Sequence, residues 1–497
     1  MRKKTFSGIG VTAGRTLCAR ILLGFAVVFI LALVYVTARF TRDTPVDYAD
    51  PIEHFKYGSV GSEHEFGVPY WLWQVLPVLF ADKLPGKGYA SLGFVYEDGH
   101  DLPIGVSKRR YRGFDVVWLN CAFCHSGTVR DTPDAKPRVI VGMPANTFDF
   151  HAFTRFFMSV GMDPRFTPQR VLLEMDRIGA NLSWIDRALM RYYIIYFARE
   201  RMLTLKGRLA FLDQQPPWGP GRVDTFNPLK VYFNFPMDKL PARELIGTVD
   251  FPSIWNVRQR DGMQLHWDGN NTSLEERNKS AALGAGVTPP TIDRERIKRV
   301  EDWLLDSKPP AYPYPIDPHL AAAGKPLYAQ YCAGCHGVDG QDFTGEYVGK
   351  VEPIEKIGTD RHRLDSYTLA VNANQNTLYA GYPWRFKNFR KTFGYANMPL
   401  DGLWLRAPYL HNGSVPSLRD LLEPSARRTK IFYRGNDLYE RSRMGFVSDV
   451  PAENGRRYFR FDTAVPGNSN RGHEGERYGT ALSAQQKDAL VEYLKTF

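Results

Sequence analysis

Cysteine is scarce in this chain, with five among 497 residues, and the number is too small for a disulfide-stapled scaffold. Excess charge is also missing from most of the sequence. The first 42 residues carry seven Lys or Arg and no acid, which accounts for most of the net charge of +11. The rest is nearly balanced, so the clustered positive charge of a nucleic-acid-binding face is not expected. A hydrophobic content of 43% with 24% charged residues excludes intrinsic disorder.

Two common enzyme motifs are absent as well. The sequence has no Gly-x-x-x-x-Gly-Lys-Ser/Thr loop for binding nucleotide phosphates. His-Glu pairs begin at His64 and His473, but Val68 and Arg477 stand where a zinc protease needs its second histidine. We therefore exclude these two classes.

One long apolar run lies near the N-terminus. Ile21 to Ala38 has 18 uncharged residues, close to the length that spans a bilayer, and Lys and Arg precede it. The positive flank predicts that the N-terminus stays in the cytoplasm and the bulk of the chain lies in the periplasm. We expect residues 1–42 to be a retained inner-membrane signal anchor. A cleaved signal peptide is the alternative, although its apolar region is usually shorter.

Four of the five cysteines form two copies of one motif, Cys121-Ala-Phe-Cys124-His125 and Cys332-Ala-Gly-Cys335-His336. This is the c-type haem attachment signature, in which two thiols bind one porphyrin and the adjacent histidine ligates the iron. A thioredoxin-like dithiol, a Cys₄ zinc site and disulfides are the alternatives. The histidine after both pairs favours two covalently bound haem c groups, with His125 and His336 as iron ligands.

The motifs fall on either side of a proline-rich segment. Residues 308–318 contain five prolines, which predicts a stiff connector between a first haem domain at 43–307 and a second cytochrome c domain at 319–497. Apolar spacing predicts a helix over 320–332 with one face towards the haem, and another over 484–497 behind a capping box at Ser483. A further helix is expected at 297–304. The predicted fold is mainly α, with two cytochrome c-like haem domains, long irregular insertions such as 43–119, and one transmembrane helix.

The second haem needs a further ligand. No methionine follows Met444, but His473 lies in a glycine-containing loop ten residues before Ser483. We predict ligation by His336 and His473, with His411 and Met398 as alternatives. For the first haem, His151 has the surroundings of an ordinary buried histidine, so an open coordination position is expected.

Further segments carry a family resemblance. They are Leu265-His266-Trp267-Asp-Gly269 followed by Leu274-Glu-Glu276, Ala407-Pro-Tyr-Leu-His411-Asn-Gly413, and Gly472-His473. With the haem motifs, they resemble the bacterial dihaem cytochrome c peroxidase and methylamine-utilisation superfamily, and more closely its rubber-oxygenase branch. The resemblance implies that Trp267 lies between the haems and aids electron transfer, and it makes Trp267 and His266 candidate catalytic residues. Trp267 as a plain core side chain stays open.

The chain departs from the peroxidase pattern at one place. The resemblance implies an acid about twenty residues after Trp267, where this sequence has Gly286, Val287 and Thr288. A haem-dependent oxidoreductase using O₂ or peroxide, with a redox partner protein, is the first functional hypothesis. The second is a pure electron carrier with both irons six-coordinate.

Overall fold

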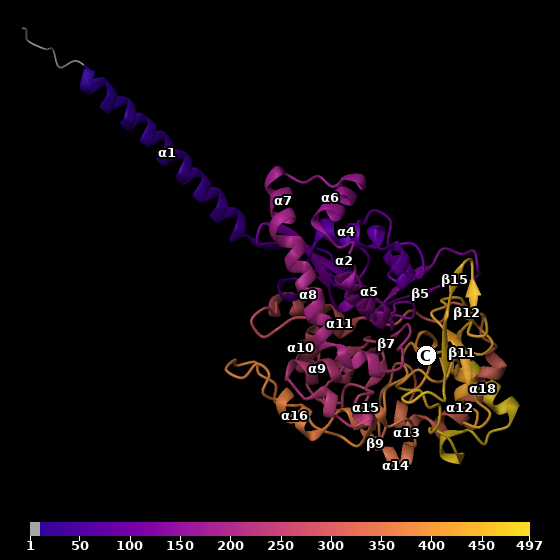
Figure 1. The fold of residues 1–497 in the computed structure, drawn as a ribbon. Helices are drawn as coiled ribbons and strands as arrows, with labels where there is room; N and C mark the ends of the chain where they lie inside the picture. The colour runs from indigo at the N-terminus through magenta and orange to yellow at the C-terminus, as the bar shows by residue number, and fades with distance from the viewer. Residues whose placement is uncertain (1–9) are drawn as a thin grey trace, which may run out of the picture.

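The N-terminal helix stands apart from the rest of the protein. In a computed structural model that describes residues 10–497, α1 (Gly10–Phe40) projects from the body into open space (Figure 1). Cys18–Phe40 is long and apolar enough to cross a membrane, and none of it is buried. Arg2, Lys3 and Lys4, part of the predicted positive flank, lie outside the described residues.

The expectation of irregular structure over 43–119 is wrong, because this region contains short helices and a four-stranded antiparallel sheet. The sheet has the strand order β1-β3-β4-β2. Two strands form a tight hairpin around Arg112 and Gly113, which both have positive φ, as a two-residue hairpin turn requires. The elements are α2 (Pro51–Tyr57), α3 (Glu63–Phe66), α4 (Tyr70–Leu79), β1 (Asp43–Pro45), β2 (Val68–Pro69), β3 (Val106–Tyr111) and β4 (Phe114–Leu119).

Helices cover this sheet around an aromatic core. Phe153 and Phe157 on one helix contact the indole of Trp73 on another, with ring centres 6.0 and 6.2 Å apart. The remaining helices of the first half are α5 (Phe150–Met162), α6 (Pro168–Arg177), α7 (Trp184–Leu189), a π-helical turn (Met190–Ile194), α8 (Ile195–Arg208), α9 (Asn227–Tyr232), α10 (Leu274–Gly284) and α11 (Arg294–Asp306). The expected helix at 297–304 is present within α11, which extends beyond it at both ends.

The second half is organised by two helices that cross closely. A Cβ built on Gly324 of α12 (Pro318–Tyr331) would lie 2.0 Å from the carbonyl oxygen of Ala489 in α18 (Ala484–Leu494). The expected helix at 320–332 corresponds to α12, and it packs against the C-terminal helix at Gly324. The capping box at Ser483 is present. The other helices are α13 (Ala333–His336), α14 (Ile354–Ile357), α15 (His362–Ser366), α16 (Leu369–Gln375) and α17 (Leu418–Leu421).

Short antiparallel pairs complete the fold. They are β5 (Ser126–Val129) with β6 (Arg138–Val141), β7 (Arg222–Asp224) with β8 (Thr248–Asp250), β9 (Val351–Pro353) with β10 (Gly394–Ala396), β11 (Ile431–Arg434) with β16 (Phe459–Asp462), β12 (Tyr439–Glu440) with β13 (Gly445–Phe446), and β14 (Ala452–Glu453) with β15 (Arg456–Arg457). Helices make up about 42% of the chain.

The two halves of the chain are joined by buried polar contacts. Arg130, directly after β5, donates to the Asp437 carboxylate at 2.6 Å, and Asp250 at the end of β8 binds Arg434 at 2.9 Å. The proline-rich segment between the halves is fixed in place, because Tyr312 is buried and the indole of Trp404 donates to the Pro310 carbonyl at 3.0 Å. Segments distant in sequence thus form one contiguous body.

Candidate haem sites

The first Cys-x-x-Cys-His motif begins in a short 3₁₀ turn (Cys121–Phe123) directly after β4. The Asn120 side chain caps this turn, accepting from Ala122 N at 2.9 Å and donating to the Gly58 carbonyl at 2.9 Å. This side chain is buried, so the motif is tied to the preceding helix region by a satisfied polar contact. The end of β4 thus places Cys121 and Cys124.

His125 is oriented by one backbone contact. Its Nδ1 lies 2.9 Å from the Pro252 carbonyl oxygen, which can only accept a hydrogen bond. Nδ1 therefore carries the proton, and Nε2 is left with a lone pair for a metal. Burial lowers the pKa of His125 to about 4, so the ring is neutral at pH 7, as a ligand must be.

The second motif ends the helical segment that begins with α12. His336, the last residue of α13, places its Nδ1 2.7 Å from the Met398 carbonyl oxygen. This is the same arrangement as His125 with Pro252, and it again leaves Nε2 as the metal-binding atom. Met398 therefore supports the histidine through its backbone.

A second imidazole faces His336. The ring centres of His336 and His473 lie 6.2 Å apart, with an angle of 44° between the ring planes. Two imidazoles bound on opposite sides of one metal ion, with metal–nitrogen bonds of about 2 Å, have ring centres about 6 Å apart. His473 Nδ1 is buried without a hydrogen-bond partner among the described residues. These residues fit a haem iron held by two histidines.

The loop that carries His473 is fixed on two sides. His473 has φ +47°, and its backbone N–H donates to the Ile357 carbonyl at 2.7 Å, at the end of α14. At Gly472 a built Cβ would lie 2.3 Å from the backbone of Gly358, so only glycine fits this close approach. On the other side the buried Arg428 donates to the carbonyls of Gly472 and His473.

His411 has a different environment. Its ring stacks on Tyr395, with centres 3.9 Å apart, and its Nε2 is buried without a hydrogen-bond partner among the described residues. The His411 carbonyl accepts from Asp250 N at 2.9 Å, which connects the two halves of the chain. The ring beside His411 is that of Tyr395, whereas the imidazole beside His336 is that of His473.

The Trp267 side chain contacts two segments that also hold candidate ligands. Its indole N–H donates to the Asp250 carbonyl at 2.7 Å, two residues before the Pro252 carbonyl that orients His125. Its ring packs on the apolar cluster that includes Ile357, whose carbonyl holds His473. These contacts connect the segment that orients His125 with the segment that holds His473.

The neighbouring candidate His266 is a half-buried residue with φ +65°. Its Nδ1 lies 2.7 Å from the Asn270 side-chain oxygen, and its ring stacks on Phe389. Burial lowers its pKa to about 4. In the segment without the expected acid, Val287 is a buried core residue. Glu276 is hydrogen-bonded to the backbone N–H groups of residues 387 and 388 and to two asparagine side chains, so it is a structural acceptor.

The thiols do not have the character of a redox-active dithiol. Burial raises the pKa of Cys121 to about 11 and of Cys332 to about 12, whereas a thioredoxin-like nucleophile needs a lowered pKa. No disulfide joins cysteines among residues 10–497. Both observations leave the thiols available for porphyrin attachment.

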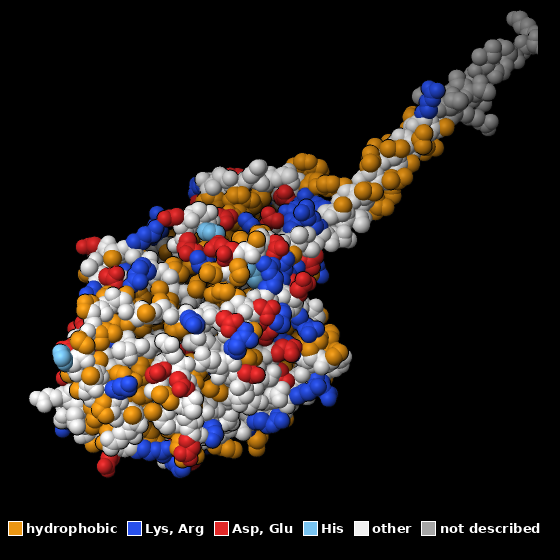
Figure 2. Space-filling view, turned by 180° about the vertical axis from the view of Figure 1, so that it is seen from behind, with side chains coloured by type: hydrophobic (Ala, Val, Ile, Leu, Met, Phe, Trp, Pro, Cys, Tyr) orange, Lys and Arg blue, Asp and Glu red, His pale blue; other side chains and the backbone are white. Residues whose placement is uncertain are grey.

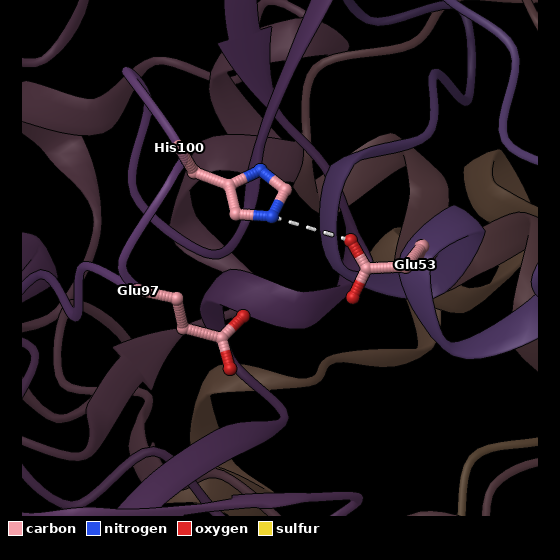
Figure 3. A group of neighbouring side chains, drawn as sticks. All are labelled: Glu53, Glu97 and His100. Atoms are coloured by element: carbon pink, nitrogen blue, oxygen red, sulfur yellow. Dashed lines mark ion pairs between the residues drawn. The ribbon is translucent and has the colours of Figure 1, made fainter.

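A separate cluster of metal-ligating residue types lies near α2. Figure 3 shows the His100 ring directed at Glu53, with Glu97 beside them. Lys56 binds both carboxylate oxygens of Glu97, at 2.9 and 2.8 Å, and Tyr57 donates to one of them. Because a lysine ammonium already neutralises this group, the cluster is an ion-pair network.

Comparison with known proteins adds to this geometry. Residues 394–433 match the RoxA-like, cytochrome c-like family. The match supports a cytochrome c of the rubber-oxygenase-like type and implies haem c. The uncharacterized protein y4iJ of Sinorhizobium fredii is 27% identical to this chain, across 96% of this chain and 98% of that protein. The uncharacterized protein y4iM of the same organism is 30% identical across 50% of this chain, and the match spans 64% of that protein.

Sequence reasoning missed the groups that orient the ligands. The Pro252 and Met398 carbonyls and the Arg428 side chain lie far in sequence from the histidines they support. Nothing in the sequence around Arg428 marks it, because its partners are backbone carbonyls. Pro252 alone has a local signal, because a proline two residues after a strand end marks a segment that leaves the sheet.

Proposed function

We propose that this protein is a membrane-anchored, periplasmic dihaem c-type cytochrome that acts as an oxidoreductase, with a reactive first haem and an electron-relay second haem. The facing imidazoles of His336 and His473 carry this proposal. An iron with two histidine ligands transfers electrons but has no position for a substrate. The two later histidines of the first half, His151 and His266, stack on Trp218 and Phe389, which favours an open position at the first haem.

Each haem would be held by one motif. Cys121 and Cys124 would bind the first porphyrin with His125 as ligand, and the second would be held by Cys332, Cys335, His336 and His473. When bound, a haem supplies an iron that gains or loses one electron, with a potential tuned by its ligands and surroundings. The protein's own contribution is to orient the imidazoles through Pro252 and Met398. Trp267 would provide a packed path between them.

Retention of the anchor is supported by its contact with the body. Arg39 at the end of α1 is bound to Asp186 of α7 and donates to the Gly113 carbonyl at 3.1 Å. Since both partners belong to the folded body, the helix continues into it through specific contacts. This favours an anchor over a segment that is removed.

The choice between O₂ and peroxide depends on whether a carboxylate is free to move protons at the first haem. Peroxide cleavage calls for a group that moves protons next to the bound oxidant. The chain has Gly286, Val287 and Thr288 where the peroxidase pattern has its acid, and Glu276 is occupied by structural donors. We therefore favour O₂ over peroxide as the small-molecule oxidant, together with a redox partner protein that supplies or accepts electrons.

The test is the spin state of each iron and its response to carbon monoxide. We expect one low-spin and one high-spin iron in the resting protein, and a carbon monoxide adduct at one haem after reduction. Two low-spin irons and no adduct would contradict the enzyme and favour a pure electron carrier. Purified protein without a Soret band would contradict both.

A further inference from the structure

An unusual row of aromatic side chains lies on the surface of the helical segment formed by α7, the π-helical turn and α8 (residues 184–208). Trp184 is 80% exposed and Tyr192 is 74% exposed. Tyr193, Tyr196 and Phe197 are also exposed. The opposite side of the segment is anchored in the core through Met190, Ile195 and Met202.

This row differs from the single exposed apolar residues that are common on protein surfaces. Single apolar side chains are common on protein surfaces, but a contiguous apolar patch marks a site of interaction. Tyr and Trp combine an apolar ring with a polar tip, and they are enriched where a membrane meets water. The composition of the row thus fits a surface that is apolar on one side and wet on the other.

The position of the row points to the same partner. Asp186, two residues after Trp184, binds Arg39 at the end of α1. Figure 1 shows α7 beside the point where α1 joins the body. In Figure 2, hydrophobic side chains lie along α1 and also at the top of the body, near the point where α1 joins it. Lys and Arg side chains gather at the same point. The row therefore lies close to the level at which the chain would leave a bilayer.

The segment also carries a net positive charge, which favours binding to an anionic surface. Residues 184–208 contain six Lys or Arg and two Asp or Glu. Arg191, directly before the tyrosines, is exposed. Guanidinium groups form strong paired hydrogen bonds with phosphate oxygens, and basic segments at a membrane surface are attracted to anionic lipids.

We propose that the exposed face of residues 184–197 docks on the bilayer surface, with anionic phospholipid headgroups as its partner. This inference rests on the proposed anchoring by α1. Docking of this kind gives the body a second contact with the membrane beside α1, which holds it in one orientation against the bilayer. A second copy of the chain on this face is an alternative occupant that the experiment distinguishes.

The experiment uses the full chain reconstituted in vesicles. Tyr193→Cys, combined with Cys18→Ser, is labelled with an environment-sensitive fluorophore, and quenching by a nitroxide on lipid headgroups is measured. Phe393→Cys is the matched control, because both residues are exposed aromatic residues: Phe393 is 65% exposed and Tyr193 is 59% exposed. We expect at least about twofold more quenching at 193 than at 393, increasing when phosphatidylglycerol is added to phosphatidylcholine.

The outcomes separate the two proposals. Equal quenching at both sites in protein that floats with vesicles would overturn the docking and leave the anchor standing. Protein that does not float would overturn both. Quenching at 193 that falls when Tyr192 and Tyr196 are changed to Ser, but not when exposed Tyr232 is changed, would support the face itself. Dilution-dependent fluorescence at 193 without lipid quenching would indicate a second copy and would also overturn the docking.

Discussion

The guanidinium of Arg428 donates a hydrogen bond of 3.0 Å to the carbonyl oxygen of His473. The same side chain is 2% exposed. It donates hydrogen bonds to five backbone carbonyls, those of residues 421, 423, 470, 472 and 473. A buried cation without a carboxylate is costly unless its donors are satisfied. Here the five carbonyls satisfy them, and in return the arginine fixes the loop that presents His473.

Removing this arginine should therefore affect the second haem specifically. We expect Arg428→Ala to lower the free energy of unfolding by about 3 kcal/mol, because several buried carbonyls lose a charged donor. In the resting protein, part of the low-spin signal of the second haem should become high-spin in electron paramagnetic resonance. Arg428→Lys should restore part of the low-spin signal. A destabilised variant whose haem signals are unchanged would assign Arg428 to stability alone.

Two histidine variants test which residue ligates the second iron. We expect His473→Ala to convert the second haem to a high-spin form, since the ring opposite His336 is removed. His411→Ala should leave the low-spin spectrum unchanged, because the recorded neighbour of His411 is Tyr395. The measurement is the visible and near-infrared absorption of both variants. The reverse result would give the ligand position to His411.

The sequence predicted the features that depend on local spacing. The terminal helix with its capping box at Ser483 and the apolar N-terminal helix are both present. The sheet over 43–119 was not predicted. Its hairpin turns at Arg112-Gly113, which is not one of the usual Asn-Gly, Asp-Gly or Gly-Gly pairs. The strand before the turn, β3, has three consecutive basic residues and no alternation of apolar and polar side chains.

The orientation of the candidate ligands could not be predicted. His336 depends on Met398, and His125 on Pro252, across 62 and 127 residues of sequence. Such contacts arise from chain topology, which periodicity does not report. The close approach of Gly324 to α18 arises from topology in the same way, and it too could not be read from periodicity.

The close crossing of α12 and α18 gives a matched pair of substitutions. Gly324→Ala places a Cβ 2.0 Å from the Ala489 carbonyl oxygen, and the helices must separate, at a cost of about 1–3 kcal/mol. Gly284→Ala, at the end of α10, meets nothing within 4 Å and should be neutral or slightly stabilising. Thermal unfolding followed at the Soret band compares the two. Equal stabilities of the two variants would mean that α12 and α18 leave room for a Cβ at position 324.

Stability should also depend on pH through His362. The hydrogen bond from its ring to Asp360, at 2.8 Å, raises the pKa of His362 above its usual 6.5. The protonated form is therefore favoured in the folded state, and this stabilisation is complete below pH 6.5 and lost as pH rises through the raised pKa. We expect a loss of about 1 kcal/mol, measured by chemical denaturation. His362→Gln should remove this part of the pH dependence, and an unchanged profile would contradict the assignment.

Trp267 should influence electron transfer more than stability. Trp267→Phe removes the hydrogen bond to the Asp250 carbonyl and part of the ring that packs towards Ile357, which should cost about 1 kcal/mol. If the indole links the two haem motifs, transfer between the haems should slow while both resting spectra stay the same. Flash photolysis of the carbon monoxide adduct in half-reduced protein measures this rate. Trp218→Phe is the control, because that buried indole also donates one hydrogen bond, to the Gln215 side chain at 2.8 Å, but packs in a cluster that contains no residue of either haem motif. Equal rates in the two variants would make Trp267 an ordinary core residue.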